Sequence, residues 1–214
     1  MENWIENHTQ HRGLNKPRLL HLIWVGTSEQ PAYLQKHITR WKELMPEWTI
    51  RLWTNDDLTP EEIKLEVLER IHEADRGVQK ADILRYYVVW KYGGIYVDAD
   101  IEPIRSLEPI LYMSDLVICH DNIIEWQYIS NAFFAASAYH PVLERALAMC
   151  LHTQLNTNAP HMTTGPSLFG RVVSQTPPVN EKYTLLDIEC FYLLDKGITP
   201  SRFGRHFYAA SWDT

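Results

Sequence analysis

The apolar positions of this chain fall into short segments that alternate between strand-like and helix-like spacing. Continuous or alternating apolar runs predict strands at 18–25, 48–53, 95–97, 116–119, 131–136 and 183–188. Apolar residues three and four positions apart predict helices at 32–45, 59–74, 78–92, 141–151 and 165–174. Because the strands alternate with helices, we expect a three-layer α/β fold with a mainly parallel central sheet.

The segment VQKADILRYYVVWKYGGIYVDADIE at 78–102 predicts a helix with one buried face, then a glycine turn and a buried strand. Gly93 and Gly94 end the helix, because glycine adopts the left-handed cap conformation at little steric cost. Residues 95–97 are β-branched and aromatic, which is typical of a strand buried on both faces.

Two carboxylates, Asp98 and Asp100, follow that strand. In an extended chain they would point to the same side, and the small Ala99 between them would let a ligand approach. Like charges held together are costly unless a cation joins them, and oxygen ligands suit Mg²⁺ or Mn²⁺. The pattern predicts a metal site, and the alternative is an acidic turn on a solvated surface.

The composition is that of a globular protein. The 214 residues are 45 % hydrophobic and 12 % aromatic, enough to bury the core of a single domain at 1–214. The net charge is −7 and the basic residues are scattered, which argues against a nucleic-acid partner. A phosphorylated ligand would need local positive charge, which a divalent cation would provide.

Three widely spaced cysteines, Cys119, Cys150 and Cys190, lie mostly in apolar runs, so we expect buried free thiols in a reducing compartment. The first residues have no apolar core region and no basic lead, and no window reaches membrane-spanning length. We therefore expect a cytoplasmic protein without a transmembrane segment, and peripheral membrane association stays open.

Asp82 and Arg85 form a second charged pair, three residues apart on the helix before the two carboxylates. One interpretation is a surface ion pair that contributes a few tenths of a kcal/mol. The other is that both side chains turn inward and hold a polyhydroxy ligand. The loop at 152–164 is long enough for us to suspect a functional lid.

The segment ADILRYYVVWKYGGIYVDAD at 81–100 resembles the signature of glycosyltransferases with a DXD sugar-binding region. That family includes fungal initiation-specific mannosyltransferases and capsular or lipopolysaccharide sugar transferases, and it is distantly akin to clostridial glucosylating toxins. Further segments stand in the family's order: HLIWVG at 21–26, PEWTIRLW at 46–53, NAFFAASAYHP at 131–141, TTGP at 163–166 and SW at 211–212. The resemblance covers roughly residues 17–213 and implies a GT-A fold, which is Rossmann-like, with retaining transfer from a nucleotide-sugar donor.

The resemblance also implies roles for the charged residues. Asp98 would face the ribose and sugar of the donor, and Asp100 would coordinate Mn²⁺ or Mg²⁺ that bridges the diphosphate. Asp82 and Arg85 match donor-sugar contacts of the family.

Other matched positions form the predicted cofactor-binding set. Trp24 and Gly26 follow the first strand, at the edge where α/β sheets bind ligands. Trp24 matches an aromatic that stacks on the nucleobase, and the alternative is a core tryptophan. Gly94 belongs to the same set, and Ser211 and Trp212 match a tail that closes over the β-phosphate as a lid.

A third metal ligand is predicted at His206, since neutral imidazole suits Mn²⁺, and the alternative is an ordinary surface histidine. Asn131 and Gln127 are polar candidates near the reacting carbon. Neither is a good nucleophile, which favours front-side displacement over a covalent intermediate. Loop residues that could contact the acceptor are His120, Asp121 and Glu125. His140 and Pro141 are expected to begin a helix.

These observations predict transfer of a hexose from a nucleoside diphosphate sugar to a carbohydrate or other hydroxyl acceptor. We favour UDP and keep GDP open. The alternative is a non-catalytic module that binds nucleotide sugars or carbohydrates. A metal-dependent phosphohydrolase would need further carboxylates or histidines around a second ion, and the sequence offers no such cluster.

Overall fold

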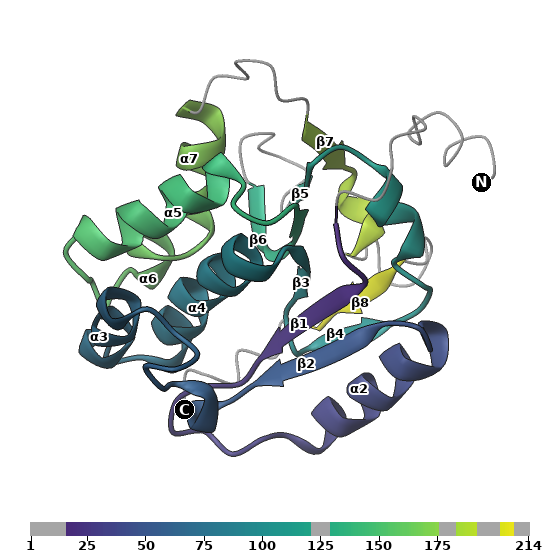
Figure 1. The fold of residues 1–214 in the computed structure, drawn as a ribbon, viewed down its shortest axis with the longest axis horizontal. Helices are drawn as coiled ribbons and strands as arrows, with labels where there is room; N and C mark the ends of the chain where they lie inside the picture. Colours follow the sequence, from purple (N-terminus) through teal and green to yellow (C-terminus); the bar gives the residue numbers. More distant parts are fainter. Residues whose placement is uncertain (1–15, 121–128, 176–182, 192–201, 208–214) are drawn as a thin grey trace.

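The computed structural model describes residues 16–120, 129–175, 183–191 and 202–207 (Figure 1). Its central sheet has the strand order β2-β1-β3-β6-β5-β7. The strands are β1 (Leu19–Ile23), β2 (Thr49–Trp53), β3 (Gly94–Val97), β5 (Leu116–His120), β6 (Ile129–Ala136) and β7 (Tyr183–Leu186). A separate two-stranded sheet pairs β4 (Ile101–Pro103) with β8 (Gly204–His206).

Helices cover both faces of the sheet. One face carries α3 (Leu65–Glu73), α4 (Gly77–Tyr92), α5 (Pro141–His152), α6 (Pro160–Thr163) and α7 (Pro166–Gln175) (Figure 1). The other face carries α2 (Ala32–Leu44) together with the β4–β8 sheet (Figure 1). Short 3₁₀ helices are η1 (Asn55–Asp57), η2 (Glu108–Tyr112) and η3 (Ile188–Cys190). The predicted three-layer α/β fold is confirmed.

The sheet is mainly parallel, as predicted, with one antiparallel strand. β1 runs parallel to β2 and β3, and β5 runs parallel to β7, whereas β6 is antiparallel to both β3 and β5. Side chains of β3 alternate between two cores: Tyr96 lies in the core beneath α4, and Ile95 and Val97 lie in the core on the α2 side. Burial on both faces explains why β3, β5 and most of β6 read as continuous apolar runs.

The glycine turn between α4 and β3 is confirmed. Gly93 has φ +68° and Gly94 has φ +101°, in the left-handed region that favours glycine. A Cβ on Gly94 would lie 2.4 Å from the carbonyl oxygen of Leu19, so close approach of β1 also requires glycine.

Part of the helical layer differs from the prediction made from the sequence. The helix predicted from residue 59 begins at Leu65. The residues around Thr59 that resemble a helix cap form a turn instead, in which the Ile63 N–H donates to the Thr59 carbonyl. The Glu62 carbonyl then accepts from Lys91 Nζ at 2.7 Å. The one-sided burial predicted for α4 is also wrong: residues 81–89 are buried all round, since α4 packs between the sheet and helices α3 and α5.

The prediction of buried free thiols is confirmed for Cys119, Cys150 and Cys190, and the reducing compartment stays a prediction. Burial raises the pKa of the Cys190 thiol to about 12, so the thiol stays protonated and unreactive at neutral pH. None of the helices in the described ranges is long and apolar enough to cross a membrane. The cytoplasmic location stays a prediction.

Candidate active site

Asp98 and Asp100 lie in a tight turn between β3 and β4, and not in the extended chain that the sequence predicted. The backbone N–H of Asp98 donates to the carbonyl of Ala132 on β6 at 2.8 Å. The N–H of Ile101 then donates back to the Asp98 carbonyl at 3.0 Å, which closes the turn. The side chains therefore converge because the backbone turns, and not because alternate residues of a strand share a side.

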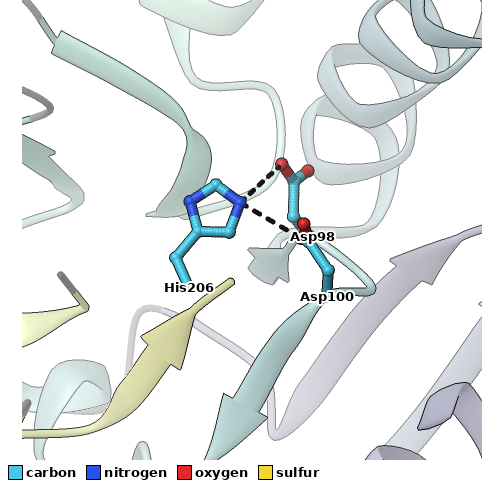
Figure 2. A group of neighbouring side chains, drawn as sticks. All are labelled: Asp98, Asp100 and His206. Carbon is cyan, nitrogen blue, oxygen red and sulfur yellow. Dashed lines mark ion pairs between the residues drawn. The ribbon is translucent and has the colours of Figure 1, made fainter. Parts of the chain in front are cut away.

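His206 completes a cluster with these two carboxylates, which we call the metal cluster. β8 pairs antiparallel with β4 and sets His206 opposite Ile101. His206 Nε2 lies 3.1 Å from Asp100 Oδ1 and 3.8 Å from Asp98 Oδ2, and Figure 2 shows the imidazole facing both carboxylates. One ligand atom from each residue lies within 4.8 Å of the others. Two carboxylates and one imidazole fit a Mn²⁺ or Mg²⁺ ion, and the predicted ligands are brought together.

Asp82 and Arg85 are 2 % exposed, so the surface ion-pair interpretation is wrong. Arg85 Nη2 lies 3.2 Å from Asp82 Oδ1, and Nη1 lies 3.1 Å from Asp98 Oδ1. Arg85 Nη1 also donates to the Asn131 carbonyl at 2.8 Å. The guanidinium thus joins α4 to the end of β3 and to β6, and it links the metal cluster to a second set of polar side chains.

That second set, the inner network, consists of Asp82, Arg85, Asn131 and Thr164. The Asn131 side-chain amide donates to Asp82 Oδ1 at 2.8 Å, and the Thr164 hydroxyl donates to Oδ2 at 2.9 Å. Burial is the largest influence and raises the pKa of the Asp82 carboxyl above its usual value, although Arg85 and the two hydrogen bonds act in the opposite direction. Burial alone would lower the pKa of Arg85, but Asp98, Tyr96 and Asp82 outweigh it and raise that pKa, so the guanidinium stays charged.

Tyr96 connects the strand to the same site. Its hydroxyl donates to Asp98 Oδ1 at 2.5 Å, and its ring lies 4.7 Å from the Arg85 guanidinium. Burial, together with Asp98, raises the pKa of the Tyr96 phenol well above its usual range, so it remains a proton donor to the carboxylate. Sequence reasoning missed the roles of Tyr96 and Thr164. Tyr96 reads as an ordinary strand residue, and the TTGP segment was the one signal that pointed to Thr164.

Trp24 lies beside the carboxylate turn. It is 7 % exposed, its indole N–H donates to the Ser28 carbonyl at 3.0 Å, and it packs in one apolar cluster with Leu34 and Ala99. Because Ala99 is the residue between the two aspartates, this shared cluster places the indole near the predicted donor site. Whether a base stacks on it stays a prediction.

The predicted glycines lie at two different ends of the sheet. Gly26, with φ +112°, exchanges two hydrogen bonds with the side chain of Asn55, and a Cβ on it would lie 3.0 Å from Gly77 Cα. The turn after β1 is thus held against the start of α4. Gly94 begins β3, at the other end of the strand from Asp98, and its contact is with Leu19.

Several predicted residues remain. His140 begins α5 as expected, since its ring Nδ1 accepts from the Val142 N–H at 3.2 Å. His120 ends β5 and is 9 % exposed, and its acceptor contact stays a prediction. The loop at 152–164 contains α6. Five predicted residues lie outside the described part of the chain, so their roles stay predictions: Asp121, Glu125, Gln127, Ser211 and Trp212.

Comparison with known proteins shows which family part of this chain resembles. Residues 31–117 match the family model for the glycosyltransferase sugar-binding region containing DXD motif. This region of the chain is similar to the DXD glycosyltransferases. The matched region begins just before α2 and includes α4, β3 and both aspartates of the metal cluster.

Curated relatives are mainly fungal. Inositol phosphoceramide mannosyltransferase 1 of Schizosaccharomyces pombe is 26 % identical over 158 residues, covering 72 % of this chain and 47 % of the relative. Mannosyl phosphorylinositol ceramide synthase CSH1 of Saccharomyces cerevisiae is 29 % identical, covering 73 % and 42 %. An uncharacterized glycosyltransferase of Acanthamoeba polyphaga mimivirus is 23 % identical, covering 83 % and 72 %. The chain spans less than half the length of the two fungal relatives.

Solved structures confirm the predicted GT-A fold. The PaToxG glycosyltransferase superposes with a TM-score of 0.65 at 16 % identity, covering 76 % of this chain and 70 % of that one. The ligand-free glycosyltransferase domain of the YGT toxin superposes with a TM-score of 0.54 at 10 % identity, covering 74 % and 77 %. At such identities the likeness concerns the fold alone.

Proposed function

We propose that this chain is a metal-dependent, retaining glycosyltransferase that moves a hexose from a nucleoside diphosphate sugar to a hydroxyl acceptor. The observation that carries the proposal is the metal cluster, joined through Arg85 to a buried polar network beside it. The names of the fungal relatives make mannose one candidate hexose. UDP remains our favoured donor nucleotide, and GDP is the second to test.

The charges of the site support a divalent cation. Asp82, Asp98 and Asp100 contribute three carboxylates and Arg85 contributes one guanidinium, which leaves two negative charges when His206 is neutral. Asp98, Asp100 and His206 would hold Mn²⁺ or Mg²⁺. When bound, the ion would stabilise the negative charge that develops on the departing diphosphate.

The inner network would orient the donor sugar. Arg85 and Asn131 hold the Asp82 carboxylate in one position, so a sugar hydroxyl would meet a preorganised set of donors and acceptors. The Asn131 amide is a poor nucleophile, and the Asp82 and Asp98 carboxylates are both paired with Arg85. This supports front-side displacement, with the acceptor hydroxyl attacking on the face that the diphosphate leaves.

The experiment is release of free UDP or GDP from donor sugars in the presence of Mn²⁺, with and without a sugar acceptor. Release that rises with acceptor supports a transferase, whereas saturable donor binding without release supports the alternative, a nucleotide-sugar-binding module. Asp100→Asn should abolish release, because it removes one carboxylate ligand. Asp56→Asn, an exposed aspartate on η1, is the matched control and should leave release unchanged. Full activity in excess EDTA would overturn metal dependence.

Trp24 is proposed to stack on the donor base. Trp24→Ala should weaken binding of free nucleotide by about 1–3 kcal/mol, the range of base–aromatic stacking. Trp48→Ala is a matched control, since Trp48 is 8 % exposed and donates to Glu108 instead. Calorimetric titration with UDP and with GDP measures the loss. If both nucleotides bind the Trp24 variant as they bind the parent, the indole is part of the core only.

A further inference from the structure

Each backbone carbonyl of the turn from Asp98 to Asp100 accepts a hydrogen bond from a different group. The first carbonyl is bonded within the turn itself, and the third accepts from the N–H of Phe207, after β8, at 3.4 Å. The middle carbonyl, that of Ala99, lies 3.1 Å from Nδ1 of His37 on α2. One side chain therefore reaches across from another element to the centre of the carboxylate turn.

The position of His37 suits this bond. His37 is 8 % exposed and Ala99 is 1 % exposed, so solvent has little access to the carbonyl. The His37 ring also lies against the ring of Tyr33, one helical turn earlier, with centroids 5.3 Å apart. Because a carbonyl oxygen can only accept, Nδ1 must carry the proton and donate it.

We infer that His37 is a positioning residue for the metal cluster, and this inference rests on the proposed function. His37 acts through the Ala99 carbonyl and fixes the rotation of the turn from which both carboxylates project. Without the donor, the buried carbonyl would lack a partner, and the turn would rotate to satisfy it. That rotation would move the two carboxylates away from the arrangement that they share with His206.

The experiment is calorimetric titration of the full chain with Mn²⁺ alone. His37→Phe keeps a flat ring against Tyr33 and removes the N–H, so the Kd for Mn²⁺ should rise about 10–100-fold, as for other groups that orient metal ligands. His37→Asn places an amide N–H near the position of Nδ1 and should restore most of the affinity. Tyr33→Leu removes the ring contact and keeps the hydrogen bond, so its Kd should match that of the parent.

The outcomes separate this inference from the proposed function. A parent that binds no Mn²⁺ overturns both. A parent that binds Mn²⁺, together with an unchanged His37→Phe variant, overturns the role of His37 alone. Equal weakening by Tyr33→Leu also overturns it, because packing of α2 would then explain the effect. If His37→Phe does not fold, His37→Leu gives the same comparison with a smaller side chain.

Discussion

The inner network and the metal cluster contain similar side chains, but the hydrogen-bond and ion-pair partners of their carboxylates differ. In the inner network, Asp82 Oδ1 accepts from Asn131 and pairs with Arg85, while Oδ2 accepts from Thr164. Each oxygen of that carboxylate has a donor from the protein, and a full positive charge lies beside it. The network is therefore complete as a piece of folded structure.

The carboxylates of the metal cluster have less positive charge beside them. Asp98 shares Arg85 with the inner network, and Asp100 pairs with an imidazole that is charged only when protonated. A divalent cation would add positive charge beside these carboxylates. The difference teaches that buried charges in this site are treated in two ways: pairing within the network fixes its shape, and a shared guanidinium beside an imidazole leaves a net negative charge that would suit a cation.

The variant with the largest expected effect removes Arg85, which pairs with a carboxylate in each group. Arg85→Met should lower the free energy of unfolding by about 3–5 kcal/mol, because Asp82 and Asp98 would both lose a buried positive partner. Urea denaturation in EDTA measures the loss without metal. Arg40→Met is the control, since the Arg40–Glu43 pair is exposed and should contribute less than about 1 kcal/mol. Equal stability of the two variants would contradict internal pairing.

A second test uses His21, whose ring bonds to a backbone carbonyl and an indole, whereas His206 faces two carboxylates. His21 is fully buried, its Nε2 lies 2.9 Å from the Gly93 carbonyl, and its Nδ1 accepts from Trp53 at 3.0 Å. Burial lowers the pKa of His21 from 6.5 to about 4. The unfolded chain therefore takes up a proton at higher pH than the folded chain does, and stability present above pH 6.5 is lost as the pH falls towards 4.

The loss should be on the order of 3 kcal/mol between those pH values, and urea denaturation at a series of pH values measures it. His21→Gln can still accept and donate but does not titrate, so its stability should depend less steeply on pH. Parallel curves for the parent and His21→Gln would show that other groups cause the acid sensitivity.

The variant with the smallest expected effect tests one hydrogen bond of the inner network. Thr164→Val keeps the shape of the side chain and removes the hydroxyl that donates to Asp82, so it should cost about 1–3 kcal/mol. Thr163→Val is the neighbouring control, because the Thr163 hydroxyl donates to the backbone carbonyl of Pro160, at 3.4 Å, rather than to Asp82. Urea denaturation of the two variants should differ, and an equal loss would mean that the Thr164 hydroxyl adds little.

Features encoded by neighbouring residues could be predicted from the sequence. The end of α4, the glycine turn and β3 follow from Gly93, Gly94 and the β-branched run after them, and each lies where the sequence placed it. The closeness of Asp98 and Asp100 also follows from their spacing. The reason why the two side chains converge could not be predicted from that spacing. The turn depends on a hydrogen bond to Ala132, more than thirty residues away.

Features set by distant contacts were missed or misplaced. The capping signals near Thr59 favoured a helix start, but Tyr87 and Lys91 on α4 bond to the backbone of residues 62–64 and fix a turn there. Thr164 carries no charge and no periodic signal, and its partner Asp82 is distant in the sequence. Local pattern identifies the elements, whereas the hydroxyls that complete the site are chosen by tertiary packing.

The pairing of β8 with β4 also sets an order of assembly during synthesis. The ribosome adds His206 only 108 residues after Asp98. At typical elongation rates that interval is roughly 5–20 s. During that time a nascent chain can form α4 and pair β3 with β1, while the third ligand does not yet exist. The metal cluster can therefore assemble only after His206 has been added, when strands β1 to β6 have already been synthesised.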